Sequence, residues 1–160
     1  MNSRTQTITI QGPAGLIQLS IDLPESLKQN PHTVLRGLAL IAHPHPLLGG
    51  TMDNKVVQTL ARTFNQLDYV CVRPNFRGVG LSEGIHDEGR GELDDLIVIS
   101  DWMRTPGAWL QSLSNANEQP WITQVNQLPL VLAGFSFGSY VGTHLVQKLA
   151  ELGRPVEQFS

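Results

Sequence analysis

Residues 128–138 read LPLVLAGFSFG, and this stretch decides the fold class. Its first half is a continuous apolar run of strand length, which is typical of a strand covered on both faces. Its second half places Ser136 between two glycines, and an amphipathic helix with Val141, Leu145 and Leu149 on one face follows at once. The stretch therefore predicts a buried strand, a tight turn and a helix in immediate succession.

The same alternation of apolar strands and amphipathic helices extends toward the amino terminus. Apolar runs of strand length each precede a segment of helical periodicity. The strands are expected at residues 38–42 and 69–72, and the helices at 54–67 and 92–104. Such an alternation is typical of a mainly parallel sheet with helices on both faces.

Two further segments complete the expected domain, which we take to be a single one over residues 1–160. Residues 5–10 and 16–23 alternate polar and apolar side chains around a turn of Gly and Pro, as in an antiparallel hairpin. Residues 108–127 are rich in Gln, Asn and Ser, and we expect an irregular surface connection there. The predicted fold class is α/β, with an amino-terminal hairpin added to the parallel strands.

Composition and charge narrow the class of protein. The formal net charge is -3, and no block of like charges could follow a phosphate backbone, so nucleic acid is not an expected partner. The single cysteine, Cys71, lies in an apolar run and excludes a disulfide framework. The sequence contains neither a signal-peptide pattern nor an apolar stretch of membrane-spanning length. These features predict a cytoplasmic protein without membrane partners.

The GFSFG sequence is a candidate nucleophilic site. A G-x-S-x-G pattern alone is a weak signal, but here it stands between an apolar strand and an amphipathic helix, as a nucleophile elbow requires. The turn would hold the Ser136 hydroxyl above the carboxyl edge of the sheet, and the Phe137 amide would face a developing oxyanion. The alternative is a serine that caps a helix, with Phe135 and Phe137 in the core.

The loop HPHPLLGG, residues 43–50, is the candidate source of a second oxyanion donor because it follows the neighbouring strand. Pro44 and Pro46 carry no N–H. The first candidates are therefore the amides of His45 and Leu47, with His45 preferred.

Metal and cofactor sites are weaker interpretations of the same segments. His43 and His45 could ligate a metal only together with other side chains, and the available ones follow no metal-site spacing. Those side chains are Asp53, His86 and Asp87. The glycine-rich segment 78–84 departs from the dinucleotide spacing and opens no helix. We expect no metal, no cofactor, and a tight turn at the rim of the site.

Taken together, these segments resemble a family of small bacterial α/β hydrolases, described as dienelactone-hydrolase-like or predicted esterases. The resemblance rests on HPHPLLGGTMDNK (43–55), RPNFRGVG (73–80), SEG (82–84), DEGRGE (87–92) and GFSFG (134–138). It implies the α/β-hydrolase fold and a lidless serine hydrolase with small-molecule ester or thioester substrates, no cofactor, and Ser136 as the nucleophile. Dienelactone hydrolases proper use cysteine, so their substrate is not carried over.

The sequence offers no acid and histidine for the rest of a triad. In this fold the serine is followed by Asp or Glu and then His on later strands. After Ser136 the only imidazole is His144, more than two turns along the same helix and too far to accept the hydroxyl proton. We therefore expect a fragment or truncated product with negligible esterase turnover.

The last residues of the chain lead to an expectation about self-association. After the helix stop at Gly153, the chain resembles the approach to another strand. Without the last strands of the fold, the strand at 128–133 would be an unprotected sheet edge, which favours self-association. The alternative to a hydrolase is a non-catalytic remnant or a binding module that uses the same crevice.

Overall fold

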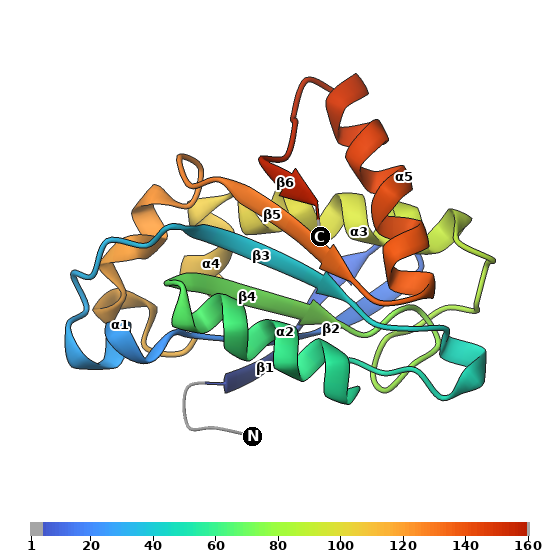
Figure 1. The fold of residues 1–160 in the computed structure, drawn as a ribbon, viewed down its shortest axis with the longest axis horizontal. Helices are drawn as coiled ribbons and strands as arrows, with labels where there is room; N and C mark the ends of the chain where they lie inside the picture. The colour runs from blue at the N-terminus through green and yellow to red at the C-terminus, as the bar shows by residue number, and fades with distance from the viewer. Residues whose placement is uncertain (1–4, 160) are drawn as a thin grey trace.

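The computed structural model describes residues 5–159, which form one six-stranded sheet with helices on both faces (Figure 1). The strands are β1 (Thr5–Gly12), β2 (Gly15–Asp22), β3 (Gly37–Ala42), β4 (Tyr69–Pro74), β5 (Leu130–Gly134) and β6 (Gln158–Phe159). The helices are α1 (Glu25–Gln29), α2 (Lys55–Gln66), α3 (Arg90–Met103), α4 (Pro106–Ser112) and α5 (Phe137–Glu151). Short 3₁₀ turns lie at η1 (Pro46–Leu48), η2 (Ala116–Glu118) and η3 (Pro120–Gln124).

The strand order is β1-β2-β4-β3-β5-β6. β3 pairs in parallel with both β4 and β5, so Leu38 is level with Val70 on one side and Leu130 on the other. β1 and β2 form an antiparallel hairpin, and β2 joins the sheet antiparallel to β4. The predicted class is confirmed: parallel strands at the centre, a hairpin at the amino terminus, and helices on both faces.

The two faces of the sheet pack into separate cores, because successive side chains of a strand point to opposite faces. On the face of α3 and α5, Leu38 and Leu40 belong to the larger core. On the face of α2, Ala39, Ile41 and Cys71 belong to the smaller one. Burial raises the pKa of the Cys71 thiol well above its usual value, which keeps it neutral and unreactive.

The segment at 108–127 corrects the expectation of an irregular surface connection. It contains η2, η3 and most of α4, and its two tryptophans, Trp109 and Trp121, are buried. The Trp109 ring lies 4.5 Å from that of Trp102 and 5.2 Å from that of Trp121, and its indole N–H donates to the Met103 carbonyl at 2.8 Å. The segment closes the core at the amino ends of the parallel strands, and its polar composition concealed this role.

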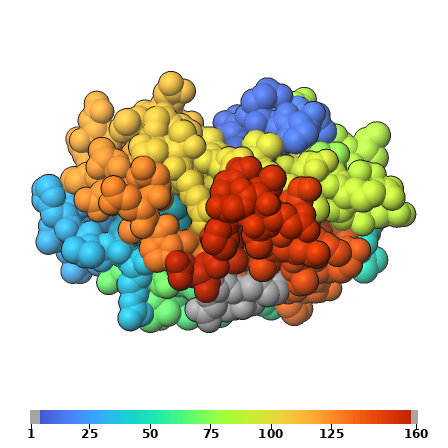
Figure 2. Space-filling model, turned by 90° about the horizontal axis from the view of Figure 1, so that it is seen from above, coloured from blue at the N-terminus to red at the C-terminus, as the bar shows by residue number. Residues whose placement is uncertain are grey.

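The carboxyl-terminal segment also changes one expectation. α5 packs against α3, and in Figure 2 the red carboxyl-terminal part of the described chain lies beside the yellow segment that includes α3. β6 then returns to the sheet and pairs in parallel with Val131 and Leu132. β5 is therefore not the outer strand that the sequence suggested, and the sheet edge passes to the two-residue β6. Among the helices of residues 5–159, none combines the length and apolarity needed to cross a bilayer.

Candidate active site

Ser136 occupies the tight turn between β5 and α5. Its backbone has φ 56° and ψ -117°, a left-handed conformation that non-glycine residues adopt rarely and at a cost. The residue is exposed, and its side chain forms no capping hydrogen bond with α5. Phe135 is also exposed, at 43% of its surface. These features argue against a capping serine between core phenylalanines.

Two glycines allow this turn, as the sequence indicated. A Cβ on Gly134 would lie 2.7 Å from the backbone of Gly138, and a Cβ on Gly138 would lie 2.2 Å from the Ala42 carbonyl oxygen. Neither distance is tolerable for a real side chain. The start of α5 therefore presses directly against the end of β3.

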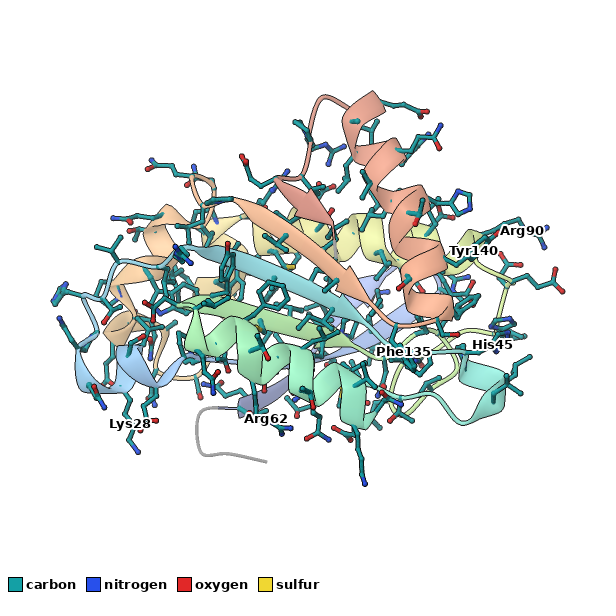
Figure 3. The ribbon with its side chains drawn as sticks, viewed as in Figure 1. Lys28, His45, Arg62, Arg90, Phe135 and Tyr140 are labelled. Carbon is teal, nitrogen blue, oxygen red and sulfur yellow. The ribbon has the colours of Figure 1, made fainter. Side chains whose placement is uncertain are left out.

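The loop after β3 lies beside the serine turn. The Phe135 amide donates to the Ala42 carbonyl at 3.2 Å, and the ring of His45 packs on that of Phe137 with centroids 4.8 Å apart. His45, Phe135 and Tyr140 gather at the same end of the sheet in Figure 3. The structure therefore brings together Ser136 and the loop that was predicted to accompany it.

His43 is fully buried and engaged at both ring nitrogens. Nδ1 lies 2.7 Å from the Pro44 carbonyl and Nε2 accepts the Phe76 amide proton at 3.0 Å, which assigns the proton to Nδ1. Burial lowers the pKa of His43 to about 4, although the bond to Pro44 opposes this shift. The imidazole is a neutral link between the ends of β3 and β4, and it has no nitrogen left to ligate a metal or accept a proton.

The candidate oxyanion donors differ in availability. The Leu47 amide already donates to Nδ1 of His45 at 3.2 Å. The His45 amide has no hydrogen-bond partner among residues 5–159. Phe137 is the first residue of α5, where the helix itself offers an amide no acceptor. The two unoccupied amides are thus those of His45 and Phe137.

His86 lies at the same rim, although the sequence suggested for it only a minor role in a metal site. Its ring centroid is 4.9 Å from that of His45 and 5.5 Å from that of Phe137. Its Nδ1 is 3.1 Å from Oε2 of Glu92, a carboxylate whose side chain is entirely buried. At the start of α3, Oε1 of Glu92 accepts the Gly89 amide proton at 3.0 Å, and no sequence pattern indicated the contact between Glu92 and His86.

The remaining titratable groups do not complete a triad within the described chain. His144 is exposed on α5, where its ring packs on Tyr140 with centroids 4.8 Å apart. Eight residues of helix separate it from Ser136, which corresponds to about 12 Å along the axis. Among residues 5–159, no group of three metal-ligating side chains is found.

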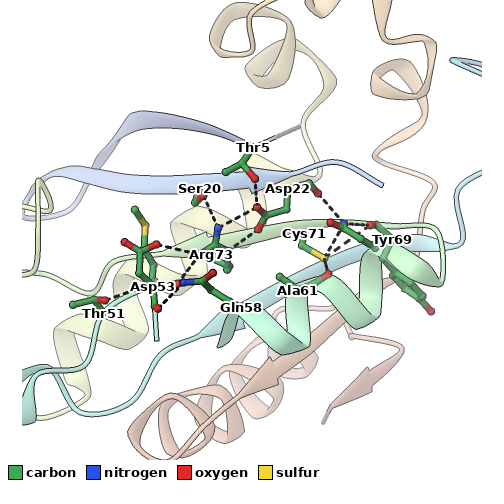
Figure 4. Close-up of polar contacts among 12 residues, drawn as sticks. Thr5, Ser20, Asp22, Thr51, Asp53, Gln58, Ala61, Tyr69, Cys71 and Arg73 are labelled. Atoms are coloured by element: carbon green, nitrogen blue, oxygen red, sulfur yellow. Dashed lines mark hydrogen bonds and ion pairs between the residues drawn. The ribbon is translucent and has the colours of Figure 1, made fainter. Parts of the chain in front are cut away.

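A buried ion pair contacts the loop between η1 and α2 (Figure 4). Arg73 at the end of β4 binds both carboxylate oxygens of Asp22, at 2.6 and 3.0 Å, and also the Ser20 hydroxyl at 3.0 Å. A further N–H of Arg73 donates to the Met52 carbonyl at 2.6 Å. A pocket of about 480 Å³ borders Arg73, Asp22 and Asp53 on the α2 face, which Ser136 does not line. The ion pair therefore stabilises the fold and lies outside the candidate active site.

Comparisons with known proteins agree with this architecture. No protein-family model matches the chain. An uncharacterized protein of Rickettsia prowazekii is 36% identical over 115 residues, which are 72% of this chain and 41% of that protein.

Two solved structures are similar over nearly the whole chain. An α/β serine hydrolase homologue from Coxiella burnetii is 34% identical with a TM-score of 0.71, and the match covers 99% of this chain and 62% of that one. An α/β serine hydrolase without lid from Xanthomonas campestris is 34% identical with a TM-score of 0.69, and the match covers 94% and 59%. This chain thus spans about three fifths of the length of these solved relatives. It has the α/β-hydrolase fold and is similar in sequence and structure to these two α/β serine hydrolases.

Proposed function

We propose that this chain carries the nucleophile of a serine hydrolase that cleaves carboxylic ester or thioester bonds through an acyl-enzyme at Ser136. The observation that carries the proposal is the backbone of Ser136, which is held at φ 56° between β5 and α5 with its residue exposed. Strain of this kind persists only where the surrounding structure imposes it, and it concentrates at functional sites. The similarity to α/β serine hydrolases supports the same chemistry.

The oxyanion of the tetrahedral intermediate would be bound by the amides of Phe137 and His45. Within residues 5–159 both lack a competing acceptor, whereas the Leu47 amide is bound to the His45 ring. The amino end of α5 adds the positive end of a helix dipole. Leu47 is therefore the least suitable of the three donors.

Turnover by the 160-residue chain alone is expected to be negligible. The base that accepts the serine proton must lie within hydrogen-bond reach, and neither His43 nor His144 meets this condition. Among residues 5–159, no hydrogen bond joins Ser136 to His45 or His86, the two imidazoles at the rim. Without base and acid, the oxyanion donors alone retain only a small part of triad catalysis. The substrate is expected to be a small molecule, and the reaction requires no metal or cofactor.

A fluorophosphonate probe followed by mass spectrometry of the intact chain tests the nucleophile. We expect one adduct at Ser136 that is absent in Ser136→Ala and present in Ser139→Ala, a matched control in the same helix. Labelling that survives in Ser136→Ala would reject the proposal. Complete failure to label a folded chain would agree equally with the missing histidine and with a binding module that uses the same crevice, so only labelling at Ser136 argues against the binding module.

A further inference from the structure

Three aromatic rings from three separate segments meet beside the serine turn. They belong to His45 in the loop after β3, His86 before α3, and Phe137 at the start of α5. Their centroids are 4.8 to 5.5 Å apart, within the range of packed aromatic pairs. Two of the three residues carry the unoccupied backbone amides described above, and His86 contacts both.

The buried carboxylate of Glu92 lies next to the His86 ring. Glu92 Oε2 lies 3.1 Å from the His86 Nδ1, at ion-pair distance but without the alignment of a hydrogen bond. Glu92 is itself fixed, because its two oxygens accept the amide protons of Asp87 at 2.9 Å and Gly89 at 3.0 Å. The His86 ring therefore lies against a carboxylate that is itself fixed at the start of α3.

The loop that carries His45 needs such a support. β3 ends at Ala42, and the next residues include an exposed 3₁₀ turn in which Leu47 and Leu48 are exposed at 69% and 84%. His43 links the base of the loop to Phe76, but His45 lies beyond that link and contacts its neighbours through its ring. An amide donor at this position is useful only if it is held still relative to the Phe137 amide.

We propose that His86 is a positioning residue of the oxyanion site, an inference that rests on the proposed function. Held by Glu92, it packs against His45 and Phe137 together and keeps their two amides in one fixed arrangement. Its action is indirect, because it touches the residues that carry the donors.

Three variants of the full chain test this role. His86→Ala removes the ring, and His86→Phe restores a ring without the nitrogen that faces Glu92. His144→Ala is the control, which removes an exposed imidazole from a different element, α5. Circular dichroism establishes that each variant is folded. The first readout is the ¹⁵N order parameter of the His45 amide, and the second is the rate of fluorophosphonate labelling at Ser136.

We expect the order parameter of His45 to fall from about 0.85 to below about 0.7 in His86→Ala. It should recover largely in His86→Phe and stay unchanged in His144→Ala. The labelling rate should follow the same order, with a loss of about 10-fold or more in His86→Ala, because small displacements of catalytic groups are costly.

Unchanged order at His45 in a folded His86→Ala would overturn the inference, and so would a loss that His144→Ala reproduces. Since the order parameter is measured without any reaction, it decides the role of His86 even where Ser136 fails to label. The failure of the proposed function would appear instead as labelling that is independent of Ser136.

Discussion

The side chain of His43 accepts the backbone proton of Phe76 across the carboxyl ends of β3 and β4, with 3.0 Å between Nε2 and N. The pair ties together the two loops that border the candidate active site. It also places a titratable group in the interior, because the imidazole is fully buried and its pKa is lowered to about 4.

Acid should therefore destabilise the protein through His43. Above pH 6.5 the imidazole is neutral in both folded and unfolded chains, so its titration contributes nothing to the pH dependence. Between about pH 6.5 and pH 4 the unfolded chain binds the proton and the folded chain does not, which costs about 3 kcal/mol of stability by pH 4. Urea unfolding at several pH values should show this loss, and His43→Gln should lack that component. Equal pH slopes in the two proteins would contradict the assignment.

Replacing Gly138 by Ala should be strongly destabilising. The added Cβ would lie 2.2 Å from the Ala42 carbonyl oxygen, so strand and helix must separate, at an expected cost of about 3 kcal/mol. Thermal and urea unfolding measure the loss. Gly107→Ala is the matched control, because a Cβ there meets nothing within 4 Å. In α4 that substitution should be neutral or stabilise by about 0.5 to 1 kcal/mol. A Gly138→Ala protein as stable as this control would mean that the close packing is wrong.

Breaking the Arg73 and Asp22 pair should cost much more than breaking a surface pair. The two side chains are only 5% and 7% exposed, so Asp22→Asn leaves the buried Arg73 with only the largely exposed Asp53, 3.5 Å away, at a cost of about 3 to 5 kcal/mol. The exposed pair of Lys148 and Glu151, 3.9 Å apart, is the control, and Glu151→Gln should change stability by less than about 0.5 kcal/mol. Similar losses in both variants, measured by urea unfolding, would argue against this difference.

Self-association through the sheet edge is the fourth prediction. β6 offers only two residues beside β5, and no strand of residues 5–159 lies beyond it. We expect sedimentation velocity to show association that increases with concentration and weakens in Glu157→Lys, because a lysine at an edge opposes strand pairing. Glu118→Lys makes the same charge change at an exposed residue of η2 and should have no effect. A monomer at all concentrations would refute the expectation.

The sequence predicted best what depends on neighbouring residues. α2 was expected at 54–67 and runs over Lys55–Gln66, because the Asn54 side chain caps the Val56 and Val57 amides at 2.9 and 3.4 Å. The strand, turn and helix around Ser136 were also expected, since their signals lie within a single stretch of the chain.

Features that join distant segments were not predicted. The pairing of Arg73 with Asp22 spans 51 residues, and no local periodicity in the sequence indicates it. The burial of Trp109 depends on Met103 and Trp121, in a segment whose composition looks like a surface loop. Among the candidate site residues, the preference for the His45 amide over that of Leu47 stays a prediction, whereas the contact of His86 with Glu92 became visible only in three dimensions.

The contact of Gly138 with the end of β3 limits which amino-acid substitutions the turn at Ser136 can accept. The backbone of the turn at Ser136 and the backbone at Ala42 form a rigid unit, so the reacting geometry tolerates little sequence change. Leu47 and Leu48 project from the next turn into solvent, and substitutions there should alter folding stability little. Sequence change at these two leucines is therefore compatible with an unchanged backbone contact between Gly138 and Ala42.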